Sequence, residues 1–244
     1  MDNLQIAIVF CLFAVLGNAI GAMLIPNKVS HYSIMNVSMA VGTGCMIGVV
    51  ILEMIPESIE LSEKAPLFLG IGFMVAHLFE HIIAPHFHFG EETHEEEMIN
   101  PLVMISTIFG MSIHSIFDGV SIGSGFVLST RLGLLVSIAI LLHKIPEGFT
   151  LSTIILCSGK RKKKAIIIAN LVGILTLLGV LMAFIFKRFV FFALPFSAGI
   201  TLYVAAADLM PIINEMKSII YSILVFVGFV IIFILHIFVH KFMI

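Results

Sequence analysis

The chain lacks tryptophan and has few charged residues. Asp, Glu, Lys and Arg make up only 11% of its 244 residues, against about a quarter in ordinary soluble domains. With 60% hydrophobic residues and a mean hydropathy of +1.16, it has more apolar surface than a soluble domain of this size can hide from water. The composition therefore indicates a protein that lies in a lipid bilayer.

Cysteine is scarce, and nucleotide-binding motifs are absent. Cys11, Cys45 and Cys157 lie in or beside apolar runs without paired spacing, which predicts buried thiols rather than disulfides or metal ligands. The sequence contains no phosphate-binding loop, so ATP-driven pumping within the chain is not expected. The N-terminus has no basic region or small-residue cleavage site, so the first apolar run is expected to be retained.

Eight apolar runs are each long enough to cross a bilayer, which takes about 20 residues as a helix. Backbone groups in hydrocarbon must be satisfied within their own segment, so these runs are predicted to be helices in one polytopic, all-α membrane domain. Only Lys187 and Arg188 separate the sixth run from the seventh, which leaves that boundary open. The runs cover residues 4–25, 37–55, 66–84, 101–127, 132–156, 165–186, 189–213 and 219–238.

Basic residues predict the orientation. The cluster at 160–164, Lys-Arg-Lys-Lys-Lys, is placed in the cytoplasm by the positive-inside tendency. Eight spans then put both termini on the non-cytoplasmic side, and the plasma membrane is the expected location. The gap at 86–99 is cytoplasmic in the same scheme. It mixes acidic residues with His86, His88 and His94, which is typical either of loose metal binding or of a solvated acidic loop.

Two internal repeats indicate an inverted-repeat architecture. Residues 114–119 read His-Ser-Ile-Phe-Asp-Gly and residues 143–148 read His-Lys-Ile-Pro-Glu-Gly, at an offset of 29. Residues 53–56 (Glu-Met-Ile-Pro) and 208–211 (Asp-Leu-Met-Pro) repeat at an offset of 155. In both cases the two helices would run in opposite directions. The repeats predict helices arranged 3+2+3 about a pseudo-twofold axis in the membrane plane.

The first repeat carries the candidate site. Residues four apart lie on one face of a helix, so His114 projects with Asp118, and His143 with Glu147. Two imidazoles and two carboxylates form a ligand set suited to zinc or another divalent first-row ion. Unpaired carboxylates at mid-membrane cost several kcal/mol, about 2.5–3.5 each, which a bound dication offsets. The alternative is a buried ion-pair network that joins the two helices.

These motifs resemble the ZIP (Zrt/Irt-like) family of divalent metal transporters, and the resemblance covers nearly the whole chain. The pattern includes both repeats of the first motif, the His-rich gap after the third span, and Ser197-Ala-Gly-Ile-Thr-Leu-Tyr203 followed by residues 208–211. The resemblance implies an eight-helix bundle with its metal site between the fourth and fifth helices. It also implies Met46 of the second helix as a further ligand, beside the alternative that Met46 is plain core.

The sequence departs from the two-metal version of the family at three positions. Ser115, Lys144 and Thr176 stand where that version has Asn, Asp and Glu. Two anionic ligands are therefore missing, and an ammonium group takes the place of one. Because Lys⁺ can neutralise shared carboxylates as a metal ion does, we expect one transported ion per site.

Four further residues are candidates for the ion's path. Glu53 and Asp208 lie near opposite ends of the second and seventh spans, where they would line the path or face headgroup water. His77 and His81, in the sequence His-Leu-Phe-Glu-His, are candidate exit ligands beside the His-rich gap. That short motif resembles an inverted zinc-protease motif, but such matches have a high false-positive rate, and catalysis there is not expected.

The sequence therefore predicts a carrier of divalent metal, not an enzyme, with no catalytic residue and no cofactor. Zinc is the expected ion, and Fe²⁺, Mn²⁺ and Cd²⁺ are variants that ligand type does not exclude. The expected mechanism is alternating access without ATP, directed toward the cytoplasm and weakened by acid. The expected partners are the ion and the bilayer, without nucleic acid, and a homodimer is left open. The alternatives are an intramembrane zinc hydrolase and a membrane metal sensor.

Overall fold

The computed structural model describes residues 2–25, 32–83, 101–216 and 218–242. Within these ranges every regular element is helical, which confirms the prediction of an all-α protein. The elements are α1 (Asn3–Met23), α2 (Tyr32–Val49), η2 (Val50–Met54), α3 (Ile55–Leu61), α4 (Ala65–Ile83), α6 (Pro101–Leu128), α7 (Thr130–Cys157), α8 (Lys162–Ile185), η3 (Lys187–Phe189), α9 (Val190–Tyr203), η4 (Val204–Leu209), α10 (Met210–Glu215) and α11 (Ile219–Phe242).

Seven helical segments of the described chain are long and apolar enough to cross a membrane. For the eighth predicted run, 66–84, the structure has α4, whose described apolar part, Ala65–Phe79, is shorter. The seven segments are Asn3–Met23, Met39–Leu61, Ile108–Leu128, Thr130–Leu156, Lys162–Ile185, Lys187–Glu215 and Ile219–Phe238. Many apolar side chains on these helices are exposed, as they are in a protein whose solvent is lipid.

Two spans contain a π-helical stretch that the sequence analysis did not anticipate. The run predicted to end at residue 55 continues as helix to Leu61, because the chain passes through η2 before Pro56. A proline has no N–H to donate and crowds the preceding turn, and a widened turn relieves both problems. The N–H of Ile55 donates to the Val50 carbonyl, five residues back. In η4, before the second proline, the N–H of Met210 donates in the same way to Ala205.

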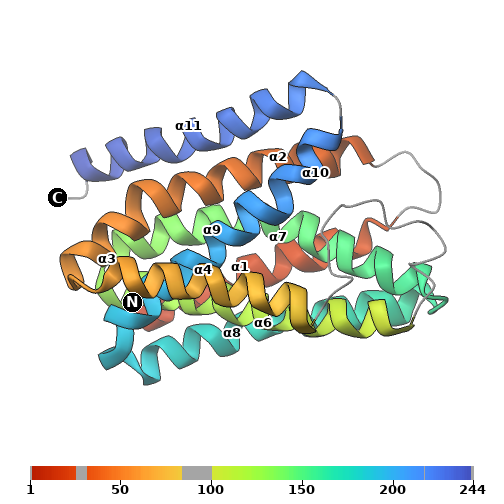
Figure 1. Cartoon of the computed structure of the whole chain (residues 1–244), viewed down its shortest axis with the longest axis horizontal. Coiled ribbons are helices and arrows are strands. Elements are labelled where there is room, and N and C mark those ends of the chain that lie inside the picture. The colour runs from red at the N-terminus through yellow and green to blue at the C-terminus, as the bar shows by residue number, and fades with distance from the viewer. Residues whose placement is uncertain (1, 26–31, 84–100, 217, 243–244) are drawn as a thin grey trace.

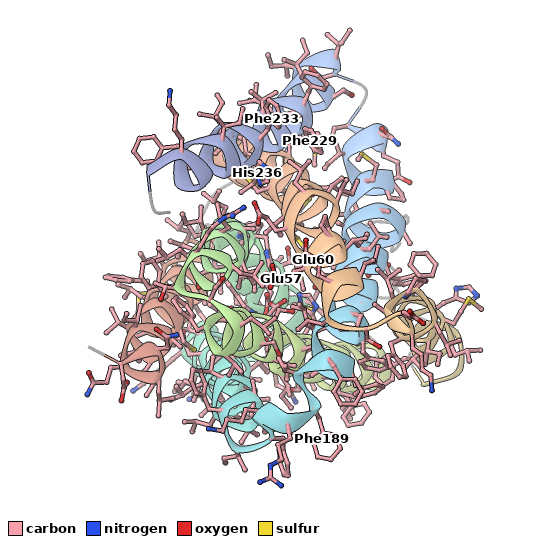
Figure 2. All side chains as sticks on the ribbon, turned by 90° about the vertical axis from the view of Figure 1, so that its left-hand side faces the viewer. Glu57, Glu60, Phe189, Phe229, Phe233 and His236 are labelled. Atoms are coloured by element: carbon pink, nitrogen blue, oxygen red, sulfur yellow. The ribbon has the colours of Figure 1, made fainter. Side chains whose placement is uncertain are left out.

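The helices form a central group with two flanking pairs (Figures 1 and 2). The central group consists of α1, α6, α7 and α8, in which α6 packs along α8 and α1 along α7. One flanking pair is α2 with α11, and the other is α4 with α9. The first pair joins the central group where α2 packs on α7, and the second where α9 packs on α6. The arrangement is what an inverted repeat requires, since each contact has a counterpart in the other half.

Close glycine contacts repeat with the same symmetry. A Cβ on Gly21 would lie 1.9 Å from the Ile145 carbonyl oxygen, and one on Gly179 would lie 2.0 Å from that of Ile116. These are equivalent α1–α7 and α8–α6 contacts. Small residues let membrane helices approach this closely, which replaces the hydrophobic force that is missing between helices in lipid. The flanking pairs contain the same kind of close contact between a glycine and the backbone of the facing helix. These contacts are Gly44 with Val225, Gly199 with Leu69, Gly228 with Val41 and Gly72 with Phe196.

The two ends of the bundle carry different connections. The described chain begins and finishes at the end where α3 lies, whereas the turn between α7 and α8 lies at the opposite end (Figure 1). We call the first the terminal end and the second the basic end, after the cluster at 160–164. Gly159 in that turn has a φ of 82°, a left-handed conformation that suits glycine. Cys11 and Cys45 are buried free thiols, as predicted, and the side chain of Cys157 lies outside the described residues.

Candidate metal centre

The centre lies where α6 and α7 pack against each other in opposite directions. Ser129 separates the two helices and caps α7, its side chain accepting a hydrogen bond from the Leu132 N–H. This tight connection fixes how the helices face each other along their length. The i, i+4 spacing then directs His114 and Asp118 of α6 toward His143 and Glu147 of α7.

The four predicted residues converge on one point. One ligand atom from each lies within 4.8 Å of the others. Oδ2 of Asp118 is 3.2 Å from Nε2 of His143 and 3.4 Å from Nε2 of His114. Asp118, His143 and Glu147 are almost fully buried, and the side chain of His114 is 11% exposed. Two nitrogens and two carboxylate oxygens at this spacing suit a divalent cation such as Zn²⁺.

His143 is held so that one ring nitrogen faces the centre. Its Nδ1 lies 3.2 Å from the carbonyl oxygen of Ala139. Because a carbonyl can only accept, Nδ1 donates in this contact, and Nε2 is the ring nitrogen that faces Asp118 and would be available to a metal ion. The backbone of His143 lies against Gly42 of α2, where an added Cβ would come within 3.1 Å of the His143 Cα. The contact brings α2 directly behind the ligand.

A fully buried lysine neutralises the carboxylates. Nζ of Lys144 lies 2.8 Å from Oδ2 of Asp118 and 2.6 Å from Oε2 of Glu147. It also donates to the hydroxyl of Ser115 at 3.0 Å, and that hydroxyl donates to Oε1 of Glu147 at 2.8 Å. The lysine therefore binds the same carboxylate atoms that a metal ion would use. Both readings of the sequence, a metal site and a buried ion-pair network, describe contacts of this one cluster.

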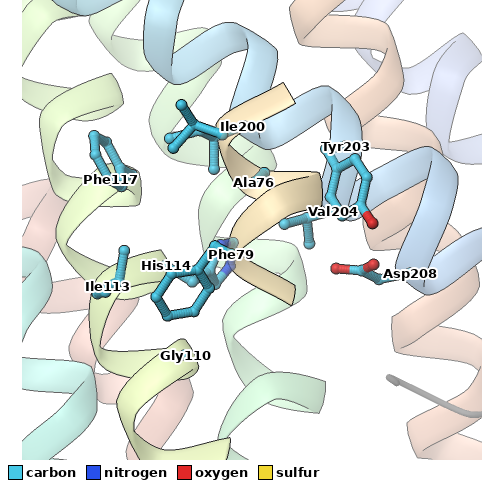
Figure 3. A pocket seen from close by; sticks show the side chains of 11 residues that line it. Ala76, Phe79, Gly110, Ile113, His114, Phe117, Ile200, Tyr203, Val204 and Asp208 are labelled. Atoms are coloured by element: carbon cyan, nitrogen blue, oxygen red, sulfur yellow. The ribbon is translucent and has the colours of Figure 1, made fainter. Parts of the chain in front are cut away.

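Two cavities border the centre. A small one of 20 Å³ is lined by Met39, His114, His143, Pro146, Glu147, Thr150, Val204 and Leu209. A second, of 80 Å³, lies on the other side of His114. Figure 3 shows Tyr203 and Asp208 across this second cavity from His114. Its wall includes the last half of α4 and the first half of α6, which places it between the centre and the basic end.

The sequence analysis missed a methionine of α2 at the centre. Met39 lines the small cavity with three of the four ligands, whereas Met46 is fully buried in a cluster with Met39, Ala205 and Leu209. Met39, Gly42 and Met46 share one helix face by their spacing of three and four residues. That spacing is the signal for Met39 in the sequence, whereas the resemblance implies only Met46 among the three methionines of α2. Ligation by Met46 stays a prediction.

Other predicted residues are placed as follows. Thr176 is fully buried on α8, where its carbonyl oxygen would lie 1.9 Å from a Cβ on Gly119, next to Asp118. Nδ1 of His77 lies 3.3 Å from the Tyr203 hydroxyl, which brings it to the edge of the second cavity. His86, His88 and His94, and the side chain of His81, lie outside the described residues.

The two acids of the second repeat are both buried but have different neighbours. Asp208 in η4 lines the second cavity with His114. Glu53 in η2 contacts Nδ1 of His236 on α11, and its Oε2 lies 3.3 Å from an Arg131 guanidinium nitrogen on α7. Both residues are buried, Glu53 at 6% and Asp208 at 7% exposure. The second repeat thus places one acid at the second cavity, toward the basic end, and the other at the contact of η2 with α7 and α11, toward the terminal end.

Residues 98–236, more than half of the chain, match the sequence model of a family described as "ZIP Zinc transporter". The chain belongs to the ZIP family. Because this is a family of transporters and not of enzymes, the expectation of a non-enzyme is confirmed. Membership together with the apolar helices establishes a multi-pass membrane protein.

Individual ZIP relatives match over parts of their length. Zinc transporter ZIP9-B of Xenopus laevis is 30% identical over 160 residues, 61% of this chain and 52% of the relative. Zinc transporter zipt-7.2 of Caenorhabditis elegans is 31% identical over 117 residues, 43% of this chain and 24% of the relative. Zinc transporter ZIP10 of Mus musculus is 28% identical over 128 residues, 51% and 15% respectively. The chain thus spans about half, or less, of the lengths of these relatives.

Proposed function

We propose that this ZIP protein carries a divalent metal ion, with zinc as the expected ion, across the membrane without ATP. The observation that carries the proposal is the convergence of His114, Asp118, His143 and Glu147 from two antiparallel helices within 4.8 Å. A centre of this composition binds zinc-like ions in the deprotonated state. The names of the matched relatives, all zinc transporters, support the same ion.

The centre binds one ion at a time in this proposal. The ammonium group of Lys144 already bridges Asp118 and Glu147, which removes the negative charge that a second dication would need. An arriving ion competes with Lys144 for Oδ2 and Oε2, and repels it. Binding and release then exchange the metal ion for the ammonium group of Lys144. The buried carboxylates therefore have a positive partner both with and without the metal ion. One equivalent of zinc per chain is expected, and two adjacent metals would contradict the proposal.

Transport proceeds by alternating access between the central group and the flanking pairs. At the terminal end, the Glu53–Arg131 ion pair joins η2 to α7 and holds this flanking pair against the central group. At the other end, the cavity lined by His114 and Asp208 gives the ion a route away from the centre. Asp208, Tyr203 and His77 are the residues that would receive it. Placing the cluster at 160–164 in the cytoplasm makes the movement inward, with both termini outside the cell.

A proteoliposome flux assay tests the proposal. Vesicles with the purified chain should take up zinc saturably, and Glu147→Ala and His143→Ala should each reduce the initial rate by about a hundredfold or more, since each removes a ligand. Glu60→Gln, an exposed acid of α3, is the matched control and should transport normally. Zinc binding without saturable flux would instead identify a metal sensor. Competition by Fe²⁺, Mn²⁺ and Cd²⁺ in the same vesicles ranks the ions.

A further inference from the structure

A large cavity lies near the terminal end, away from the metal centre. It has a volume of 380 Å³, within the size range of small-molecule sites, and opens between α6, the last turn of α8 and the start of α9. Its wall is apolar except for one serine, and contains five phenylalanines. The lining residues are Phe117, Val120, Ser124, Met182, Ala183, Phe186, Phe189, Val190, Phe192, Ala193 and Phe196.

The cavity changes character along its length. α6 ends at Leu128 and α8 at Ile185, both at the terminal end, so each residue's distance from those ends gives its depth. Ser124 lies about one helical turn, roughly 6 Å, inside the end of α6. Phe117 lies about two turns deeper, with its ring 5.4 Å from that of Phe196. The hydroxyl thus lies between two aromatic parts of the wall, one at the mouth and one at the deep end, where Phe117 contacts Phe196.

Two bases stand at the mouth. The three-residue turn η3 includes Lys187 and Arg188, and the adjoining Phe186 and Phe189 both line the cavity. Both bases are exposed, and neither forms an ion pair within the described residues. Figure 2 shows Phe189 at the outer edge of this corner of the bundle. Bases beside lipid-facing helix ends lie at the depth of the phosphate groups, where they attract an anionic headgroup. In the orientation proposed above these two bases face the outer leaflet, so the bound anionic lipid is one of that leaflet.

The serine hydroxyl is a polar group without a partner of its own. Ser124 is fully buried, and its Oγ has no hydrogen-bond partner among the residues that the structure describes. A hydroxyl left unbonded in an apolar wall is unfavourable, so an acceptor that enters the cavity is stabilised there. Its depth, between the bases at the mouth and Phe117 with Phe196 at the deep end, is that of the ester carbonyls of a glycerolipid.

We propose that this cavity binds one anionic glycerophospholipid. The phosphate lies at Lys187 and Arg188, an ester carbonyl accepts a hydrogen bond from Ser124, and an acyl chain follows the wall down to Phe117. Phosphate, ester and hydrocarbon then each meet protein groups of matching chemistry, in the order in which a lipid presents them. The position matters for transport, because Phe117 directly precedes Asp118 and also lines the cavity beside His114.

Native mass spectrometry of the detergent-purified full chain tests the proposal with two probes, phosphatidylglycerol and phosphatidylcholine of the same acyl chains. Wild-type protein should retain one phosphatidylglycerol after delipidation. Lys187→Gln with Arg188→Gln should weaken its binding on the order of tenfold, since each base contributes. The control pair is Lys163→Gln with Lys164→Gln, which makes the same charge change at the basic end and should leave retention intact. An equal loss in both pairs, or equal retention of phosphatidylcholine, would overturn the proposal.

Two variants fill the cavity without changing charge. Ala193→Phe does so from α9 and Ser124→Leu from α6, so the steric test does not depend on one variant folding. Either folded variant should lose the retained lipid, and unchanged retention in a folded variant would show that the lipid binds elsewhere. If the wild-type protein is instead a dimer without bound lipid, and Ala193→Phe converts it to a monomer, the cavity binds a second copy of the chain. That result would overturn the proposal. Each readout is independent of metal transport.

Discussion

The ammonium nitrogen of Lys144 lies 2.6 Å from Oε2 of Glu147, one of the four atoms that converge on the metal centre. The lysine is fully buried, and its nearest neighbours are acceptors. Buried charges are stable only when paired, so this cation is the counter-charge of the metal-free centre. Removal of the lysine should therefore separate the properties of the empty centre from those of the loaded one.

Lys144→Met should make the fold depend on metal. The change shortens the side chain by one heavy atom and leaves Asp118 and Glu147 without a cation, and loss of one partner of a buried pair costs about 3–5 kcal/mol. The thermal midpoint should fall without zinc, and saturating zinc should raise it by more than it raises the wild-type midpoint. The apparent KM for zinc should change as well. The control is Lys163→Met, an exposed lysine outside the centre, and equal zinc responses in the two variants would contradict the account of Lys144.

The four candidate ligands could be predicted from the sequence because their information is local. A spacing of four residues on a helix fixes one face, and a repeat at an offset of 29 makes two such faces complementary. The same holds for the helical class of the fold, which follows from the length of the apolar runs. Lys144 was predicted to be a counter-charge from the family resemblance, because it stands where the two-metal version has an Asp.

Features that depend on packing between distant helices could not be predicted. Met39 lies at the centre because Gly42 lets α2 approach α7, and the sequence does not show which of the three α2 methionines comes close. The pairing of Glu53 with Arg131 joins residues 78 positions apart. The π-helical turns were missed because the length of an apolar run predicts a helix but not a widened turn within it, whether the run was predicted to stop before the proline (37–55) or to pass it (189–213).

Substitution of Met39 and Met46, two of the three α2 methionines, should identify which thioether serves the ion. Met39 lines the small cavity, so Met39→Leu should weaken Cd²⁺ transport more than Zn²⁺ transport, because a thioether is a soft ligand. Met46→Leu is the matched change on the same face of α2, about two helical turns away. Competition of Cd²⁺ against ⁶⁵Zn²⁺ uptake measures both. A selective effect at Met46 alone would favour the ligand that the family resemblance implies.

The Glu53–Arg131 pair should show a favourable coupling energy. Glu53 is 6% exposed and the Arg131 side chain 23%, so the pair is partly screened and a coupling of about 0.5–3 kcal/mol is expected. Glu53→Gln and Arg131→Gln should each lower the thermal midpoint, and the double variant should lose less than the two together. Exposed Glu60→Gln, combined with Arg131→Gln, provides an additive control. If the effects of Glu53→Gln and Arg131→Gln on the thermal midpoint are strictly additive, the ion pair does not hold η2 against α7 as proposed.

Zinc uptake should fall as the outside solution becomes acidic. Imidazoles and carboxylates bind metal only when deprotonated, so protons compete with the ion at every ligand of the centre. The loss should appear as a rise in the apparent KM that high zinc concentration overcomes, since the competition is for the same atoms. Initial rates measured across pH 5 to about 8 at low and saturating zinc would show it. A fall in the maximal rate with constant KM would place the titrating group outside the centre.

Gly148→Ala should disturb both the fold and the metal centre. A Cβ at this position would lie 2.0 Å from the carbonyl oxygen of Asn18, a backbone atom that cannot turn away, so α7 must move off α1. Overpacking of this kind costs about 1–3 kcal/mol, and the displaced helix carries Glu147 in the preceding position. Gly70→Ala is the matched control, because nothing lies within 4 Å of its added Cβ. We expect a lower thermal midpoint and slower zinc flux in Gly148→Ala only. If both variants behave like the wild type, close packing of α1 on α7 does not position the ligand.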